Sequence, residues 1–354
     1  MIVRAKTKRR LVFLLVGVLL AVSVLAALYV IRRAQRQKYY LGLRDSGLVA
    51  YKAGDYLTTL NNLAIYTGRY RDDADALYYL AEARRRVETP DGSRHLLLTI
   101  QHYRRVLELR PDREDVRRDL VLLYSKLGYS NEVIDLADRI LEKKPDDVPV
   151  LVAKARAQAV LRNYKESLAT AQLAVKAAPL DVEAQAMTLK LYGLLDRKQD
   201  VLPHAQAILD SHPEDGRAEL LMAVACMVLS DLSPEQQTKI RALMASRYPD
   251  VKLDVVTARM AAMVFVRKAA QRKISDLAYA RFLVAQLDLL RLPAEAAEVL
   301  DLALASAKED DPPLRRNLVR RFFEIGRYAD VEKRLADVAL KPAGPEVDMM
   351  ALKA

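Results

Sequence analysis

The chain has no tryptophan and is poor in phenylalanine, histidine and cysteine, and these gaps exclude several classes of function. Its single cysteine, Cys226, excludes an internal disulfide framework and any multi-cysteine metal site. With only 11 glycines, it contains no GxGxxG, Walker or GxSxG loop that would cradle a phosphate or present a nucleophile. The 4 histidines are scattered without an HExxH pattern, at His95, His102, His204 and His212. We therefore expect no catalytic, cofactor-binding or metal-binding residues and predict that the protein is not an enzyme.

The formal net charge of +11 belongs to one end of the chain. Residues 1–38 contain no acidic side chain and nine basic ones: Arg4, Lys6, Lys8, Arg9, Arg10, Arg32, Arg33, Arg36 and Lys38. Removing these nine from the 57 Lys and Arg leaves 48 basic against 46 acidic residues, a net charge of +2. A nucleic-acid-binding protein is expected to carry a basic face on its folded part. We therefore predict no nucleic-acid partner.

Between two basic clusters, residues 11–31 read LVFLLVGVLLAVSVLAALYVI, without a single charge. A helix of this length rises about 30 Å, enough to cross the hydrocarbon core of a bilayer. The alternative is a cleaved signal peptide, whose apolar region is usually only about 7–15 residues long. The longer run, closed by RRAQRQK, favours an uncleaved single-span anchor. We expect a basic tail at 1–10, a transmembrane helix at 11–31 and a basic juxtamembrane linker at 32–39.

The charges on either side of this segment predict its orientation. Five basic side chains and the amino terminus precede it, and four basic side chains follow it. The positive-inside rule slightly favours a cytoplasmic N-terminus. In a bacterium this orientation would place the rest of the chain on the periplasmic side of the inner membrane.

A proline recurs at a fixed interval along the middle of the chain. Pro111, Pro145, Pro179 and Pro213 stand 34 residues apart, and each is followed within two residues by Asp. An apolar-rich run precedes each of them. A regular period of this length is typical of repeat proteins, in which one supersecondary unit is used many times.

The segment 114–145 shows the repeated unit. Two runs follow the spacing of a helix face, the first at Leu120, Leu123, Tyr124 and Leu127 and the second at Val133, Leu136, Ala137, Ile140 and Leu141. Gly128, between them, suits the left-handed residue that ends a helix. Pro145 ends the second helix, because the residue before a proline is disfavoured in the α region. Asp146 or Asp147 can then cap the next helix.

Two antiparallel helices in 34 residues resemble the tetratricopeptide repeat (TPR), whose pattern is W-x2-L-G-x2-Y, then A-x3-F and a final P. The family's Trp is absent, and the matching residues are Gly47 and the turn 53–56; Leu120, Tyr124, Ala137 and Pro145; Ala155, the turn 162–164, Ala171, Ala174 and Pro179; and Tyr192, Ala205 and Pro213. The resemblance implies an all-α fold, a right-handed superhelical solenoid of antiparallel helix pairs with a concave inner surface. It also implies the family's role of holding other proteins, often as extended peptide segments in that groove.

The resemblance also predicts how the chain is divided. A TPR array of about six repeats is expected at 40–249, with a longer turn at 87–95 that we interpret as a tolerated surface excursion. Degenerate TPR-like helical repeats are expected at 250–354, with helical runs at 252–273, 276–291 and 294–307 and a clearer repeat at 314–342. Residues 343–354 read as the start of another first helix. Either a capping helix closes the stack there, or the chain is the front part of a longer protein.

The outward faces of the first helices are predicted to line the groove. The candidate partner-binding residues on these faces are Arg44, Tyr51, Lys52, Tyr78, Arg85, Arg86, Arg118, Lys126, Arg156 and Lys190. Glu82, Asp115 and Glu183 are partial counterweights, and from the sixth repeat the lining is expected to become apolar, at Leu220, Val224, Met227 and Val228. This pattern favours a partner segment with acidic and hydrophobic parts, although solvated charges on ordinary helices would produce it as well. Leu48, where a carboxylate-clamping repeat would carry asparagine, argues against that narrower specificity.

Taken together, these features predict a membrane-anchored TPR scaffold or adaptor without enzymatic activity. Its expected partner is a protein or peptide segment, and its expected setting is bacterial envelope assembly at the inner membrane. Two alternatives remain open from the sequence. One is a docking receptor on an organelle membrane, and the other is the recognition arm of a larger enzyme whose catalytic domain would follow residue 354.

Overall fold

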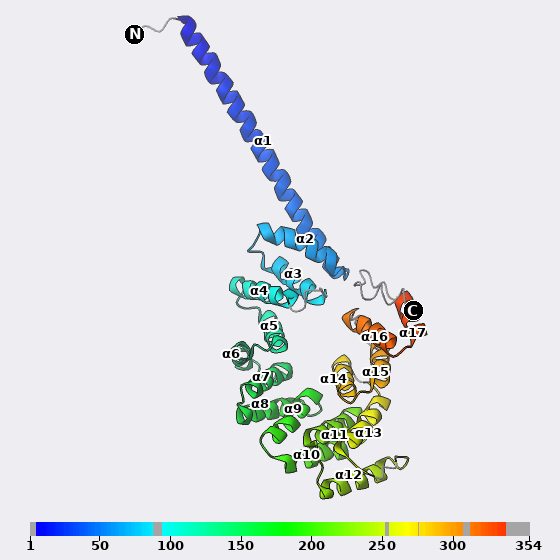
Figure 1. Cartoon of the computed structure of the whole chain (residues 1–354). Coiled ribbons are helices and arrows are strands. Elements are labelled where there is room, and N and C mark those ends of the chain that lie inside the picture. Colours follow the sequence, from blue (N-terminus) through cyan, green and yellow to red (C-terminus); the bar gives the residue numbers. More distant parts are fainter. Residues whose placement is uncertain (1–4, 88–93, 252–254, 275, 307–311, 338–354) are drawn as a thin grey trace. The chain divides into compact units, whose positions relative to one another are not determined.

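The computed structural model describes residues 5–87, 94–251, 255–274, 276–306 and 312–337, and within these ranges every regular element is a helix (Figure 1). The helices are α1 (Ala5–Lys52), α2 (Tyr56–Arg69), α3 (Ala74–Arg86), α4 (Arg94–Leu109), α5 (Glu114–Leu127), α6 (Ser130–Leu141), α7 (Val148–Val160), α8 (Tyr164–Ala177), α9 (Val182–Leu194), α10 (Lys198–Ser211), α11 (Gly216–Leu229), α12 (Pro234–Arg247), α13 (Ala258–Gln271), α14 (Leu277–Leu289), α15 (Pro293–Ser306), α16 (Pro312–Glu324) and α17 (Tyr328–Asp337). The chain forms two compact units, 1–116 and 117–354, with the boundary inside α5.

The turn inside each helix pair has a residue with positive φ just after the first helix. The residues with positive φ in the described chain are Gly54, Gly128, Arg162, Asp196, Ser230, Arg291 and Gly326. From Gly128 to Ser230 they recur at intervals of 34 residues, the same period as the prolines. A left-handed residue lets the chain reverse tightly after a helix. The prediction for Gly128 is therefore confirmed, and in three pairs of the series a residue other than glycine does the same.

The turn between pairs is fixed by aspartate caps. Asp73, Asp147 and Asp181 precede α3, α7 and α9, and the carboxylate of each accepts a hydrogen bond from a backbone N–H in the first turn of its helix, at 3.0, 3.3 and 2.8 Å. These N–H groups have no partner within the helix, so a side-chain oxygen there stabilises the helix start. The predicted cap at 146–147 is confirmed, and Asp147 is the residue that provides it.

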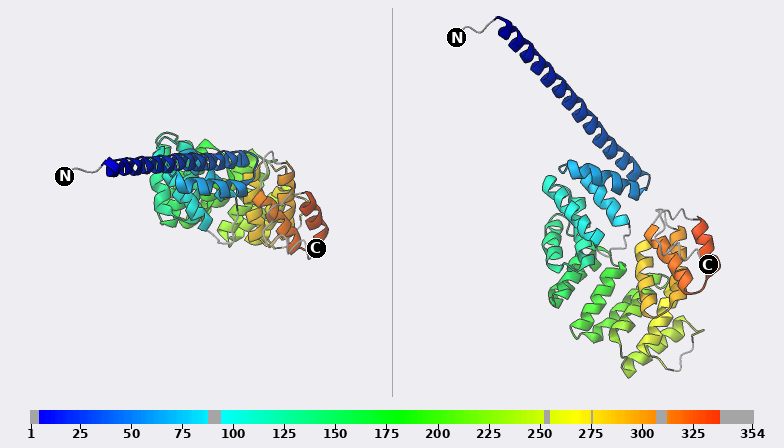
Figure 2. Two further views of the ribbon diagram at one scale, coloured as in Figure 1. Left: turned by 90° about the horizontal axis from the view of Figure 1, so that it is seen from above. Right: turned by 45° about the horizontal axis from the view of Figure 1, so that its top comes forward.

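In the first unit, α1 is one continuous helix that joins the apolar segment to the first repeat. Figures 1 and 2 show it as a long rod whose C-terminal end alone lies against α2 and α3. Its described apolar side chains before residue 32 are exposed. Residues 32–39, expected to form a separate linker, are helical like the rest of α1. Near the C-terminal end, Gly47 allows close contact with α2, because a Cβ there would lie 2.8 Å from Leu63.

The second unit has its core around α11. Almost every residue of α11 is buried, and the helix packs against α9 and against α13. A helix that is apolar all round belongs in a protein interior. α13 stands outside the alternation of pairs, since no positive-φ residue follows it and α14 then pairs with α15 and α16 with α17. An extra helix thus lies between the sixth pair and the last two.

The predicted all-α architecture of antiparallel helix pairs is confirmed. Six pairs end at Arg247, and the later runs correspond to α13, α14 and α15, with α13 starting at Ala258. Of the remaining expectations, residues 88–93 of the excursion, the acidic pair at 310–311 and the segment 343–354 lie outside the described residues.

Candidate functional site

The second unit contains a cavity of about 820 Å³ at the N-terminal ends of its first helices. Its apolar lining comes from α5, α7, the α8–α9 turn and α9: Leu122, Val148, Pro149, Val152, Ala153, Pro179, Leu180 and Val182. Its polar lining is Ser125, Lys126, Arg156, Asp181, Glu183, His212, Arg217 and Asp276, and the first residues of α14 complete it. Ligand pockets typically have about 300–1,000 Å³ and a mostly apolar lining with a few polar groups. This cavity has both properties.

Three cations border the cavity on successive first helices: Lys126 on α5, Arg156 on α7 and Lys190 on α9. We call these three residues the basic belt. Lys126 and Arg156 line the cavity directly. Burial lowers the pKa of Lys190, and the positive charge of Arg156 lowers it further while Glu183 opposes this. Lys190 therefore lies close enough to Arg156 for the two like charges to repel.

The belt keeps an excess of positive charge. Arg156 pairs with Glu183 at 3.2 Å, but both side chains are about half exposed, so solvent screens the pair. Among the described residues, Lys126 and Lys190 form no ion pair. The cavity's other carboxylates are occupied at helix starts, where Asp181 caps α9 and Asp276 caps α14. An anionic group of a partner would relieve this excess charge.

An apolar strip follows the belt one turn farther along the same helix faces. Val160 is 65% exposed and Leu194 is 54% exposed. Both lie four residues after a belt residue, and 194 − 160 gives the repeat period of 34. Residues four apart share a helix face. The face thus has an apolar cavity at one end, cations in the middle and apolar side chains at the other end.

The sequence predicted this belt but also predicted residues that hold the fold instead. Arg118 is not part of the belt, because its guanidinium pairs with Asp147 at 2.8 Å. In the first unit, Arg44 pairs with Asp73 at 2.7 Å, and Tyr66 donates a hydrogen bond to the same carboxylate. Each arginine therefore joins one pair to the aspartate cap of the next.

The other predicted residues of the first unit form an aromatic and ionic cluster between α1, α2 and α3. Arg85 pairs with the buried Glu82 at 2.9 Å. Arg86 lies over the rings of Tyr51 and Tyr56, 5.8 and 5.1 Å from their centroids. The ring of Tyr78 carries the guanidinium of Arg113 at 4.5 Å, and Lys52 is exposed at the end of α1. Cation–π contacts of this kind hold adjacent helices together.

The expected apolar lining of the sixth repeat is wrong. Leu220 and Val224 are buried, and Met227 and Val228 are partly buried in the same core cluster. The reason is α13, which packs on α11 and covers it. The chain-order pattern alone gave no sign that a later helix would occupy this face.

Sequence reasoning missed several residues that line the cavity. Arg217 could have been found, since 217 − 183 = 34 places it at the same repeat position as Glu183. Asp276, Ala278 and Tyr279 at the start of α14 could not, because α14 lies outside the period. They reach the cavity through the tertiary packing of α14 near α9 and α11.

Among the described residues, no three His, Cys, Asp or Glu side chains gather as metal ligands would. His204 forms a hydrogen bond with Gln185 at 2.7 Å. Cys226 is fully buried, and burial raises the pKa of its thiol to about 12. At neutral pH the thiol is therefore protonated and a poor nucleophile.

In the described chain one helical stretch, Val18–Lys52, is long and apolar enough to cross a membrane. Length and composition are the criteria, and none of its most apolar window is buried against the rest of the protein. A signal sequence near an N-terminus meets the same criteria. The membrane assignment therefore remains part of the proposal below.

The structure is similar to solved helical-repeat proteins at low sequence identity. A tetratricopeptide repeat protein from Parabacteroides merdae aligns over 80% of this chain and 98% of its own, with a TM-score of 0.47 and 13% identity. MamA from Desulfovibrio magneticus RS-1 aligns over 49% and 94%, with a TM-score of 0.42 and 13% identity. MamA of strain MSR-1 aligns over 48% and 92%, with 0.40 and 21%. No family model and no curated protein matches the sequence. The helix pairs of this chain themselves define its TPR-like solenoid.

Proposed function

We propose that this protein is a membrane-anchored, non-enzymatic scaffold that binds a segment of a partner protein in the cavity of the second unit. The main support is the position of the basic belt between that apolar cavity and the strip formed by Val160 and Leu194. A matching segment would carry a carboxylate flanked by apolar side chains. Charge complementarity of this kind favours specificity and fast association, while the apolar contacts supply affinity.

The anchor in this proposal is residues 11–31, with the repeats in the periplasm and a role in bacterial envelope assembly. The continuous helix α1 would hold the first repeat close to the membrane surface without a flexible spacer. The basic side chains at 32–38 would lie among lipid headgroups. A partner would thus be held near the membrane rather than released into the compartment.

The belt is tested by peptide selection. Full-length protein in lipid nanodiscs is used to select from a random linear peptide library, and a selected peptide is then measured against variants. The triple variant Lys126→Glu, Arg156→Glu, Lys190→Glu should weaken binding by about tenfold or more. The matched control reverses three exposed cations of the second helices α6 and α8, Arg139→Glu, Lys165→Glu and Lys176→Glu. Equal affinities for both triple variants would contradict a role of the belt.

Topology is tested separately. A tag after Ala354 is followed while protease is added to intact cells and then to cells whose outer membrane has been opened. Loss of the tag only after opening supports the periplasmic assignment. Protection until the inner membrane is lysed would place the repeats in the cytosol and favour the docking-receptor alternative.

A further inference from the structure

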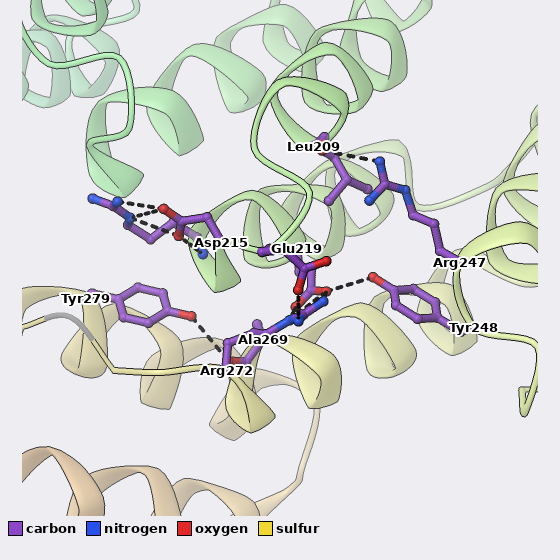
Figure 3. A network of polar contacts seen from close by, with 10 residues as sticks. Leu209, Asp215, Glu219, Arg247, Tyr248, Ala269, Arg272 and Tyr279 are labelled. Carbon is purple, nitrogen blue, oxygen red and sulfur yellow. Dashed lines mark hydrogen bonds and ion pairs between the residues drawn. The ribbon is translucent and has the colours of Figure 1, made fainter.

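A buried ion pair joins α13 to α11 at the point where α14 begins. The carboxylate of Glu219 on α11 is fully buried. The guanidinium of Arg272, the residue after α13, lies 3.0 Å from it through Nη2, with further contacts from Nε at 3.3 Å. Tyr248, which follows α12, donates its hydroxyl to the same carboxylate at 3.0 Å (Figure 3). Three helix ends therefore converge on one buried charge.

The network is fully satisfied on its polar side. Burial and the neighbouring Glu219 raise the pKa of Tyr248, so its hydroxyl remains a donor at neutral pH. Hydrogen bonds with Glu219 raise the pKa of Arg272 as well. Arg272 also pairs with the exposed Glu214 at 2.5 Å. A buried carboxylate that lost this arginine would be left as an uncompensated charge, which is strongly unfavourable.

A second contact fixes the first turn of α14 beside the ion pair. The buried Tyr279 donates its hydroxyl to the backbone carbonyl of Ala269 at 3.3 Å, as Figure 3 shows. Gly216 makes room for this arrangement. A Cβ at Gly216 would lie 2.6 Å from the hydroxyl oxygen of Tyr279 and 2.9 Å from the Cβ of Arg272. A side chain at 216 would therefore push both groups away.

The residues placed in this way form a wall of the cavity. Asp276, Ala278 and Tyr279 line it from α14, while Ser125, Arg156 and other residues line it from α5, α7 and α9. Arg217, also on the lining, pairs with Asp215 at 2.6 Å at the start of α11. The wall thus rests on the junction of α11, α13 and α14.

We infer that Glu219, Arg272 and Gly216 are positioning residues that set the width of the cavity by holding the α14 wall. The inference rests on the proposed function for its meaning, since the cavity is the proposed partner site. The extra helix α13 then acts as a spacer that brings α14 to the cavity. The pair selects the size of the apolar side chain that can enter between α14 and α7.

The direct test is a distance measured across the cavity without any ligand. Spin labels are attached to the full-length protein at Ser125→Cys and Ala278→Cys, on opposite walls, while the buried Cys226 stays unlabelled. Arg272→Gln and Gly216→Ala should each give a longer and broader distance distribution. Arg247→Gln removes an arginine from the neighbouring α12 that pairs with Asp210 and should leave the distribution unchanged. Circular dichroism confirms that each variant is folded, and Arg272→Lys should partly restore the wild-type distance.

Binding of the anionic naphthalene dye ANS, measured on unlabelled protein, separates the two ideas. If Arg272→Gln and Gly216→Ala change the distance and weaken dye binding by about tenfold, the positioning role is supported. If the distance changes but even the wild type binds no dye, positioning stands and the proposed site loses its support. An unchanged distance in both folded variants overturns the inference, whatever the dye does.

Discussion

The guanidinium of Arg118 lies 2.8 Å from the carboxylate of Asp147, and the same carboxylate caps α7 through the N–H of Val150. Asp147 is almost fully buried, whereas Arg118 is partly exposed. One carboxylate therefore ends a turn between repeats and joins α5 to the next pair. Arg44 and Asp73 repeat this relationship in the first unit.

Removing this cap should destabilise the protein measurably. Asp147→Ala is expected to lower the free energy of unfolding by about 1–2 kcal/mol, because the N-cap bond and the ion pair are lost together. Arg118→Met should cost less, about 0.5–1 kcal/mol, because its side chain is partly solvated. Urea unfolding followed by far-ultraviolet circular dichroism measures both. The neighbouring exposed Asp146→Ala is the control, and a loss as large as that of Asp147→Ala would contradict this role of the cap.

Two of the turn residues offer a gain in stability. Arg162 and Asp196 have φ angles of 63° and 58°, a conformation that is strained for residues with a Cβ. Arg162→Gly and Asp196→Gly should each raise the free energy of unfolding by about 0.5–1 kcal/mol. Gly128→Ala, at the equivalent turn with φ of 80°, should lower it by about 1 kcal/mol. If the glycine variants are less stable than the wild type, the positive φ is not the controlling factor.

The stability of the first unit should fall in mild acid because of His102. Burial, and then the charge of Arg84, lower the pKa of His102 to about 4 from an ordinary value of 6.5. The unfolded chain therefore takes up a proton below pH 6.5 that the folded chain refuses, so stability is complete above that pH and falls toward pH 4. At pH 5 the loss should be about 2 kcal/mol relative to pH 7.5.

The measurement compares urea midpoints at the two pH values in the wild type and in His102→Leu. The variant should lose less stability on acidification than the wild type does. Arg84→Met should reduce the pH effect in part, because the repelling charge is gone. Equal pH dependence in the wild type and His102→Leu would show that His102 does not titrate as described.

The continuity of α1 predicts a rigid connection between the apolar segment and the first repeat. Spin labels at the exposed positions Ile31→Cys and Val49→Cys, eighteen residues apart, should give a narrow distribution. A helix rises about 1.5 Å per residue, so the backbone separation should be about 27 Å. Gln35→Pro removes a helix hydrogen bond and should broaden and shorten the distribution. A wild-type distribution as broad as that of the proline variant would restore the predicted linker at 32–39.

Much of the fold could be predicted because its signals are local. The period of Pro111 to Pro213, the left-handed Gly128 and the capping Asp147 act within a few residues of where they stand. The repeat period also carried part of the site, since it placed Lys126, Arg156 and Lys190 on one face. It could not tell which cations are free, because Arg118 is held by a residue 29 positions away.

The sequence by itself determined the helix pairs, their turns and the apolar N-terminal segment, because hydrogen bonding, capping and periodicity follow from neighbouring residues. Only the tertiary structure decided that α13 would cover α11, burying Leu220 and Val224, and that α14 would form a wall of the cavity. That decision depends on the buried pair of Glu219 and Arg272, 53 positions apart. A buried charge selects its partner by geometry in the packed protein, and no local pattern in the chain records that choice.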